Sequence, residues 1–157
     1  MHVLFICTGN IFRSLTAEYG LRAALPADSG VRVSSAGTED FPHVVKDVVR
    51  EYLSTKGLDV SRHARRTLTR EILTAATVPV AMSTDHRAFI RKSFGIEAPL
   101  FTEVCGLGAE PLPDVDDVVP DFETNPTAVA AHVRFTIDRI LSLTPTLAAR
   151  IARGEVG

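Results

Sequence analysis

The stretch C-T-G-N-I-F-R-S, residues 7–14, decides the fold class because of what stands on either side of it. Residues 3–6, V-L-F-I, form a short apolar run typical of a buried strand. Residues 14–25 carry apolar side chains at helical spacing, and Pro26 ends the pattern. A strand, a glycine-containing turn and a helix in this order predict the start of a βαβ unit.

The same alternation continues along the chain. Further strands are predicted over 31–34, 78–82 and 99–101, and helices over 44–56, 85–94 and 126–143, with a loop over 103–125. Strands separated by helices form parallel sheets that are covered on both faces. We therefore expect one α/β domain over residues 1–157, with a four-stranded parallel sheet, helices on both faces and a loosely packed tail from about residue 144.

Composition narrows the class of protein. The 157 residues suit one domain, and a hydrophobic fraction of 45% excludes global disorder. A formal charge of -2 argues against nucleic acid as a partner, and two cysteines are too few for a disulfide scaffold. The apolar run before residue 8 is too short for a signal peptide or a membrane span. We expect a cytoplasmic monomer without a membrane or nucleic-acid partner.

Residues 7–14 have the composition of an anion-binding loop. Gly9 and Asn10 tolerate positive φ, which lets successive N–H groups turn toward one point. The helix that starts near Arg13 adds its positive end, and the Arg13 guanidinium can hold two phosphate oxygens. Such surroundings favour the thiolate of Cys7, while Ser14 can donate a hydrogen bond to the sulfur. The predicted phosphate contacts are Thr8, Gly9, Asn10, Ile11, Phe12, Arg13 and Ser14.

A resemblance to a known family rests on these residues and on three later segments. Cys7, five residues and then Arg13-Ser14 resemble the signature of the low-molecular-weight protein tyrosine phosphatases. The likeness continues in A-E at 17–18, S-S-A-G-T at 34–38 and G-L-D-V-S-R-H at 57–63, and it reaches roughly residue 142. The resemblance implies a phosphatase fold with its phosphate-binding loop after the first strand.

The same resemblance implies a two-step reaction on a phosphorylated protein or a small phosphate ester. Cys7 would attack phosphorus to form a phosphocysteine, and Arg13 with the loop N–H groups would stabilise the transition state. Ser14 would support the leaving thiolate, and a late aspartate would protonate the leaving oxygen. No metal or other cofactor is expected. The side chains implied to support the loop are Asn10, Ser35 and His63.

The general acid has no direct counterpart in the family signature, because the family's Asp-Pro-aromatic segment is absent. The candidates lie in the predicted loop over residues 103–125, which we call the late loop. They are Asp114, Asp116, Asp117 and Asp121. We predict Asp117, since D-V-D-D-V at 114–118 reads onto the family segment and Asp117 lies twelve residues before Val129, the first core position of the last helix. Asp114, in L-P-D at 112–114, is the second choice.

Other departures bear on the substrate and on regulation. Phe12 stands where many family members carry a second cysteine, so no protective disulfide beside Cys7 is expected. The chain has no Trp, and Phe41 is predicted to form the aromatic wall for the substrate. A basic run is interpreted as a solvated face: Arg62, Arg65, Arg66 and Arg70.

Two other functions remain open at the level of sequence. A thiol-dependent arsenate reductase would share this loop but needs a resolving thiol, for which only Cys105 is present. An oxyanion-binding module without catalysis is the second alternative, because the loop that should carry the acid has diverged. Retention of both Cys7 and Arg13 favours the phosphatase over either alternative.

Overall fold

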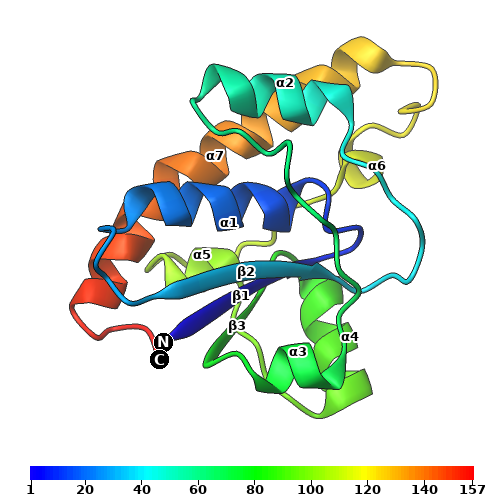
Figure 1. Ribbon diagram of the computed structural model, residues 1–157. Helices are drawn as coiled ribbons and strands as arrows, with labels where there is room; N and C mark the ends of the chain where they lie inside the picture. The colour runs from blue at the N-terminus through cyan, green and yellow to red at the C-terminus, as the bar shows by residue number, and fades with distance from the viewer.

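Three parallel strands form the centre of the structure, a computed structural model that describes residues 1–157 (Figure 1). The elements in chain order are β1 His2–Cys7, α1 Arg13–Ala24, β2 Arg32–Gly37, α2 Asp47–Thr55, α3 Arg70–Thr74, β3 Val78–Ala81, α4 Thr84–Phe94, α5 Phe101–Val104, α6 Val115–Val118 and α7 Pro126–Ala152. The strand order is β2-β1-β3, with β1 in the middle. The predicted α/β class is therefore confirmed.

Both faces of β1 are buried, which explains its unbroken apolar sequence. Val3, Phe5 and Cys7 face a cluster that includes side chains of α1, α5 and α7. Leu4 and Ile6 point the other way, into a cluster with α3 and α4. Figure 1 shows the same layers, with α1 and α7 on one side of the sheet and α3 and α4 on the other. The alternation leaves the two ends of β1, and not its faces, open to a ligand.

The predicted fourth strand over residues 99–101 is wrong. The segment makes a single β-bridge, between Ala81 and Leu100, and Phe101 already begins α5. Pro99 has no N–H with which to extend a ladder. In addition, the Glu103 carboxylate accepts the Leu100 N–H at 2.6 Å, which starts the helix instead. The sheet therefore has three strands rather than four.

The last helix is longer than the sequence predicted. It continues past residue 143 to Ala152 although Pro145 lies inside it. Proline cannot bond to the carbonyl four residues back, which here belongs to Leu141. The Thr144 hydroxyl donates to that carbonyl at 3.0 Å and replaces the missing bond. Beyond Pro145 the helix buries Leu147 and Ile151 in the main core, so residues 144–152 are packed and not loose.

None of the helices combines the length and the apolar character that crossing a membrane requires.

Candidate active site

Residues 8–12 connect β1 to α1 just beyond the carboxyl end of β1. Asn10 has φ 57°, and it is the only residue other than glycine with positive φ. Gly37, at the end of β2, packs directly against this loop, because a Cβ there would lie 2.6 Å from the Thr8 carbonyl oxygen. The glycine of S-S-A-G-T is therefore needed for the close approach of β2 to the loop.

The carbonyl groups of residues 7–10 are bound by neighbouring segments. The carbonyl of Cys7 accepts the Thr38 N–H at 2.9 Å, and that of Thr8 accepts the Glu39 N–H at 3.2 Å. The next two carbonyls are bound by side chains, with Arg65 Nε donating to Gly9 at 3.2 Å and His63 Nε2 donating to Asn10 at 2.8 Å. By contrast, the N–H groups of residues 8–12 donate to no acceptor in the protein. Such unpaired donors are rare in folded proteins and indicate an anion site.

Three reactive side chains lie together at this loop. Cys7 is 2% exposed, and its Sγ lies 3.0 Å from Ser14 Oγ. Arg13 is also 2% exposed; its guanidinium donates to the Leu112 carbonyl at 2.9 Å and forms an ion pair with the Asp114 carboxylate. The structure thus brings the late loop directly over the residues that the sequence predicted.

These groups line an open cleft of about 650 Å³. Its lining residues are Cys7, Thr8, Gly9, Ile11, Phe12, Arg13, Glu39, His43, Lys46, Asp47, Val48, Val49, Asp114, Val115, Asp116, Phe122, Val129 and Val133. Aspartate side chains from the late loop therefore reach the cleft next to Cys7, together with apolar side chains from α7 and the segment before α2.

The structure separates the four candidate aspartates. Asp114 lies in the cleft at Arg13, and its side chain also caps α6 by accepting the Val115 N–H at 2.8 Å. Asp117 is not among the lining residues; its carboxylate accepts the Asp114 N–H at 2.7 Å and holds that turn in place. Asp116 lines the cleft, whereas Asp121 does not. The geometry favours Asp114 over the predicted Asp117.

Phe41 does not form the wall that was predicted for it. Its side chain is 64% exposed and is absent from the cleft lining. It packs edge-on against the His43 ring, with 5.6 Å between the ring centroids, and His43 lines the cleft instead. The aromatic side chains of the lining are Phe12 and Phe122. Phe122 follows the aspartate run by five positions, and no spacing rule in the sequence singled it out.

A buried network supports the strained residue of the loop. Asn10 Nδ2 donates to Ser35 Oγ at 2.7 Å and to Ser14 Oγ at 3.1 Å, and its Oδ1 accepts the Arg66 N–H at 2.9 Å. Ser35 donates in turn to the Glu18 carboxylate. The structure therefore places Ser35 and His63 at Asn10, as expected. The position of Glu18 in this network was not predicted.

The basic run after His63 is more than a solvated face. Arg65 bridges the Gly9 carbonyl and the Glu39 carbonyl, so it ties the loop to the segment after β2. Arg66 donates through Nη2 to the Ser35 carbonyl at 3.0 Å. Both arginines are positioned by the same turn that brings His63 to the loop. In sequence they cannot be told from Arg62, which has no such contact with the loop.

A buried histidine beside the loop was also missed. His86, in the first turn of α4, is 4% exposed, and its Nε2 lies 2.9 Å from Thr8 Oγ1. Its Nδ1 lies 2.9 Å from Ser83 Oγ. Burial, assisted by the Arg13 charge, lowers the pKa of His86 to about 3, so the ring is neutral at ordinary pH. A single histidine in a helical pattern gives no sequence signal for such a position.

Cys105 lies in the core rather than in the cleft. It is 2% exposed and packs in the cluster between the sheet, α5 and α7. Burial raises the pKa of the Cys105 thiol to about 12, which disfavours its thiolate. Cys105 is therefore poorly placed to resolve a modified Cys7.

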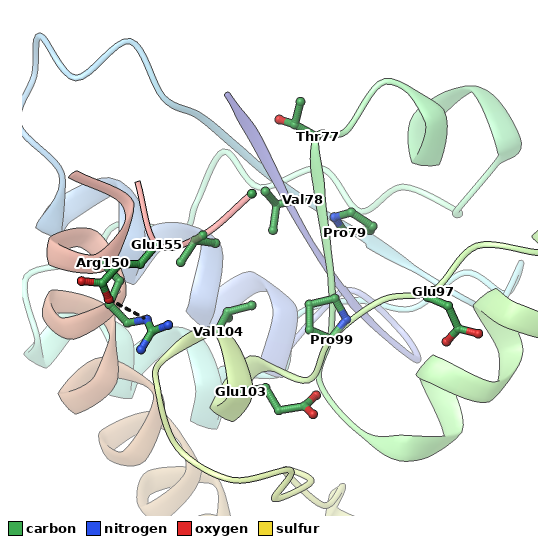
Figure 2. A pocket seen from close by; sticks show the side chains of 11 residues that line it. Thr77, Val78, Pro79, Glu97, Pro99, Glu103, Val104, Arg150 and Glu155 are labelled. Carbon is green, nitrogen blue, oxygen red and sulfur yellow. Dashed lines mark ion pairs between the residues drawn. The ribbon is translucent and has the colours of Figure 1, made fainter. Parts of the chain in front are cut away.

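A second cleft, of about 330 Å³, opens near the amino end of β3 (Figure 2). Its lining residues are Thr77, Val78, Pro79, Glu97, Pro99, Glu103, Val104, Arg150, Glu155, Val156 and Gly157. Arg150 and Glu155 form an ion pair on one side of it, with 3.7 Å between Nε and the carboxylate oxygen, and Figure 2 marks this pair. The Glu103 carboxylate is already bound to Arg87 and to the Leu100 N–H. This cleft contains neither a thiol nor a positive-φ loop residue other than the terminal glycine.

The comparison with protein families assigns the class of protein. Residues 2–104 match the model of the low molecular weight phosphotyrosine protein phosphatases, which is more than half of the chain. The chain belongs to this family. The match includes β1, the loop and α1, and it ends before the late loop that carries Asp114.

Individual relatives carry two different phosphatase names. The chain is 36% identical over 87 residues to the low molecular weight protein-tyrosine-phosphatase Etp of Escherichia coli K12, which covers 55% of this chain and 57% of Etp. It is 28% identical over 102 residues to the protein-arginine-phosphatase of Bacillus subtilis 168, covering 60% and 64%. The chain thus spans less than two thirds of the curated relatives that it matches.

Solved structures extend the likeness over the whole fold. A YwlE arginine phosphatase mutant with a phosphorylated active-site serine superposes with a TM-score of 0.82 at 23% identity, covering 98% of this chain and 97% of that one. A low molecular weight protein tyrosine phosphatase from T. tengcongensis gives a TM-score of 0.76 at 25% identity, covering 96% and 99%. These likenesses support the fold, including the part beyond residue 104.

Proposed function

We propose that the protein is a metal-independent phosphomonoesterase of the protein tyrosine phosphatase type, acting through a phosphocysteine. The observation that carries this proposal is the meeting of Cys7, Arg13 and Asp114 in one cleft. The family membership and the names of the relatives support it. The loop of residues 8–14 is then the phosphate-binding loop.

The phosphoryl group is held by donors that the fold leaves unpaired. The N–H groups of residues 8–12 face the cleft side of the loop, since the carbonyls of residues 7–10 are bound on the other side. Arg13 uses three of its five N–H hydrogens on Leu112, Thr8 and Asp114, so two remain for phosphate oxygens. Fixed donors of this kind stabilise the charge of the transition state without a metal ion.

Cys7 is the nucleophile. Its sulfur forms a bond to phosphorus while the bond from phosphorus to the ester oxygen breaks. Water then attacks the phosphocysteine, and the thiolate leaves. Ser14 Oγ, at 3.0 Å from the sulfur, stabilises that thiolate by donating a hydrogen bond, and Asn10 holds the Ser14 hydroxyl in position.

Asp114 is the general acid of this mechanism, in place of Asp117. It protonates the ester oxygen as that oxygen leaves, and it then accepts a proton from the attacking water. The bound phosphate competes with Asp114 for Arg13, which frees the carboxyl group to reach the ester oxygen. Asp117 acts through Asp114 by fixing the turn that carries it.

The cleft lining favours an aryl phosphate as substrate. Apolar side chains surround the phosphate loop, and they suit the ring of a phosphotyrosyl side chain. They are those of Ile11, Phe12, Phe122, Val129 and Val133. A phosphoarginyl side chain is the second candidate, because carboxylates of Glu39, Asp47 and Asp116 also line the cleft and can accept guanidinium hydrogens. With that substrate the sulfur of Cys7 would displace nitrogen from phosphorus, and the acid would protonate the leaving nitrogen instead of an ester oxygen. Two peptides of one sequence, carrying either residue, distinguish them by kcat/KM.

The direct test is hydrolysis of p-nitrophenyl phosphate in excess EDTA by the wild type and by Cys7→Ser. Turnover by the wild type and trapping of a phosphocysteine support the proposal; full activity of Cys7→Ser contradicts it. Arsenate reduction, measured in parallel with an external thiol, tests the alternative, which the burial of Cys105 disfavours. An inactive wild type that still binds phosphate would indicate the binding module.

We further infer that the protein acts as a monomer in the cytoplasm, without nucleic acid or membrane. The net charge of -2 and the two reduced, buried cysteines support this inference. Light scattering at micromolar concentration tests the oligomeric state, and a stable dimer would contradict it.

A further inference from the structure

The side chain of Thr8 makes contacts that the mechanism above leaves unused. Its Oγ1 accepts a hydrogen from Arg13 Nη2 at 3.3 Å and lies 2.9 Å from His86 Nε2. Thr8 also lines the cleft beside Cys7. One hydroxyl group is therefore shared by the phosphate clamp, a buried histidine and the space where phosphate would bind.

The direction of the hydrogens in this chain of contacts follows from Ser83. Ser83 Oγ lies 2.9 Å from His86 Nδ1, and both residues are buried. The Ser83 hydroxyl has no other acceptor among side chains or backbone, and a buried hydroxyl hydrogen without an acceptor is costly. Ser83 therefore donates to Nδ1 of His86.

The state of His86 then fixes the role of Thr8. Burial keeps the ring neutral, so it carries one hydrogen, and Nδ1 is occupied as an acceptor. The hydrogen is on Nε2 and is donated to Thr8 Oγ1. The Thr8 oxygen thus accepts from both His86 and Arg13, and its own hydrogen finds no acceptor in the protein.

Building on the proposed function, we propose that the Thr8 hydroxyl donates this hydrogen to a phosphoryl oxygen in the cleft, and that His86, held by Ser83, is its positioning residue. The phosphate is then held by a side-chain hydroxyl in addition to the loop N–H groups and Arg13. Because two donors already point at Thr8 Oγ1, the hydroxyl hydrogen is directed before the substrate arrives. A preorganised donor to a charged oxygen strengthens both phosphate binding and catalysis.

The kinetics of two Thr8 variants test the hydrogen bond from the Thr8 hydroxyl to the phosphoryl group. Thr8→Val keeps the shape and removes the hydroxyl, and we expect kcat/KM for p-nitrophenyl phosphate to fall roughly 10- to 100-fold. Thr8→Ser restores the hydroxyl and should stay within about threefold of the wild type. Thr74→Val is the matched control, because its hydroxyl bonds only to helix carbonyls of α3. Wild-type kcat/KM in Thr8→Val would overturn the proposal.

A second measurement does not depend on turnover. Inorganic phosphate should protect Cys7 from iodoacetate, and Thr8→Val should need roughly tenfold more phosphate for half protection. If the wild type is inactive but Thr8→Val still weakens protection, the proposed phosphatase activity is wrong, while the hydrogen bond from Thr8 to phosphate is supported. If the wild type is active and Thr8→Val matches it in both assays, the hydrogen bond from Thr8 to phosphate is refuted, while the phosphatase activity is supported.

The positioning role of His86 has its own spectroscopic signature. Nitrogen-resolved NMR of the wild-type imidazoles should show His86 as the neutral Nε2–H tautomer from pH 8 to pH 5. The Nδ1–H tautomer would mean that Thr8 donates to His86 and has no hydrogen left for phosphate, which overturns the proposal. His86→Gln places an amide N–H near the position of Nε2 and should retain more kcat than the shorter His86→Asn, with similar KM; equal kcat in the two variants would contradict the positioning role.

Discussion

The two clefts of the molecule both contain an arginine opposite a carboxylate, yet they differ in what surrounds that pair. In the cleft at the carboxyl end of β1, Arg13 is almost fully buried and pairs with Asp114 above a loop with unpaired N–H groups. In the cleft near the amino end of β3, Arg150 and Glu155 lie 3.7 Å apart at the chain terminus (Figure 2). An ion pair by itself therefore does not identify a site.

The two clefts differ in how many of their polar groups already have partners within the protein. Near the amino end of β3, Glu103 is bound by Arg87 and a backbone N–H, and Glu155 is shared between Arg150 and Arg153. At the carboxyl end of β1, the loop carbonyls are bound while the N–H groups remain free. Several free N–H donors around a thiol can act on a ligand. Near the amino end of β3, Arg150 Nε is a buried donor without a hydrogen-bond partner, but it stands alone and no thiol lines that cleft.

The strongest way to break this comparison is to remove the thiol. Cys7→Ser should lower kcat for p-nitrophenyl phosphate by about 10⁴-fold or more, because a hydroxyl at this position has no adjacent base to activate it. Phosphate binding should persist, since the loop donors are unchanged. In the second cleft, Glu155→Gln should leave kcat within about twofold of the wild type. A comparable loss in Glu155→Gln would show that the two clefts are not functionally distinct.

The two arginines give the next largest contrast. Arg13→Lys should reduce kcat roughly 10³-fold, because an ammonium group cannot hold two phosphate oxygens and the Leu112 carbonyl together. Arg150→Lys, the same change in the other cleft, should leave kcat within about twofold. Circular dichroism melting serves as the control for folding. An Arg13→Lys enzyme with near wild-type kcat would refute the clamp.

The late-loop aspartates sharpen the comparison within the active cleft itself. Asp114→Asn should slow hydrolysis of phenyl phosphate roughly 100-fold but that of p-nitrophenyl phosphate much less, because p-nitrophenolate departs without a proton. Asp117→Asn keeps a side-chain acceptor for the Asp114 N–H and should slow both substrates by similar, smaller factors. A leaving-group dependence confined to Asp117→Asn would restore the assignment made from sequence.

The sequence was sufficient for the local features of the fold and the loop. The run before Cys7, the Gly9-Asn10 turn and the Asn125-Pro126 helix start are local patterns, and β1, the loop and α7 lie where they indicate. The end of α7 was misjudged at Pro145 because a hydroxyl from Thr144 replaces the lost bond. A predicted strand at 99–101 failed because Glu103 binds the Leu100 N–H.

The partners of several site residues could not be predicted from the sequence. Asp114 and Asp117 are three residues apart in an acidic run, and only the orientation of the α6 turn decides which one meets Arg13. Phe41 matched a family position but lies against His43 outside the cleft. His86 reaches Thr8 across 78 residues of sequence. The contacts of Asp114 with Arg13 and of His86 with Thr8 depend on how distant segments pack, and no periodicity or motif encodes them.

The smallest expected effect concerns stability and His86. The ring is buried and neutral, with its pKa lowered to about 3 from an unfolded value of 6.5, so below pH 6.5 the unfolded chain binds one more proton than the folded protein at this site. Stability from this group is fully present above pH 6.5 and is lost as the pH falls toward 3, at up to about 1.4 kcal/mol per pH unit. Between pH 6.5 and 5 the wild type should therefore lose about 2 kcal/mol more unfolding free energy than His86→Gln, which cannot titrate. Urea unfolding of both proteins at several pH values measures this difference, and parallel pH profiles would show that His86 is not buried in its neutral form.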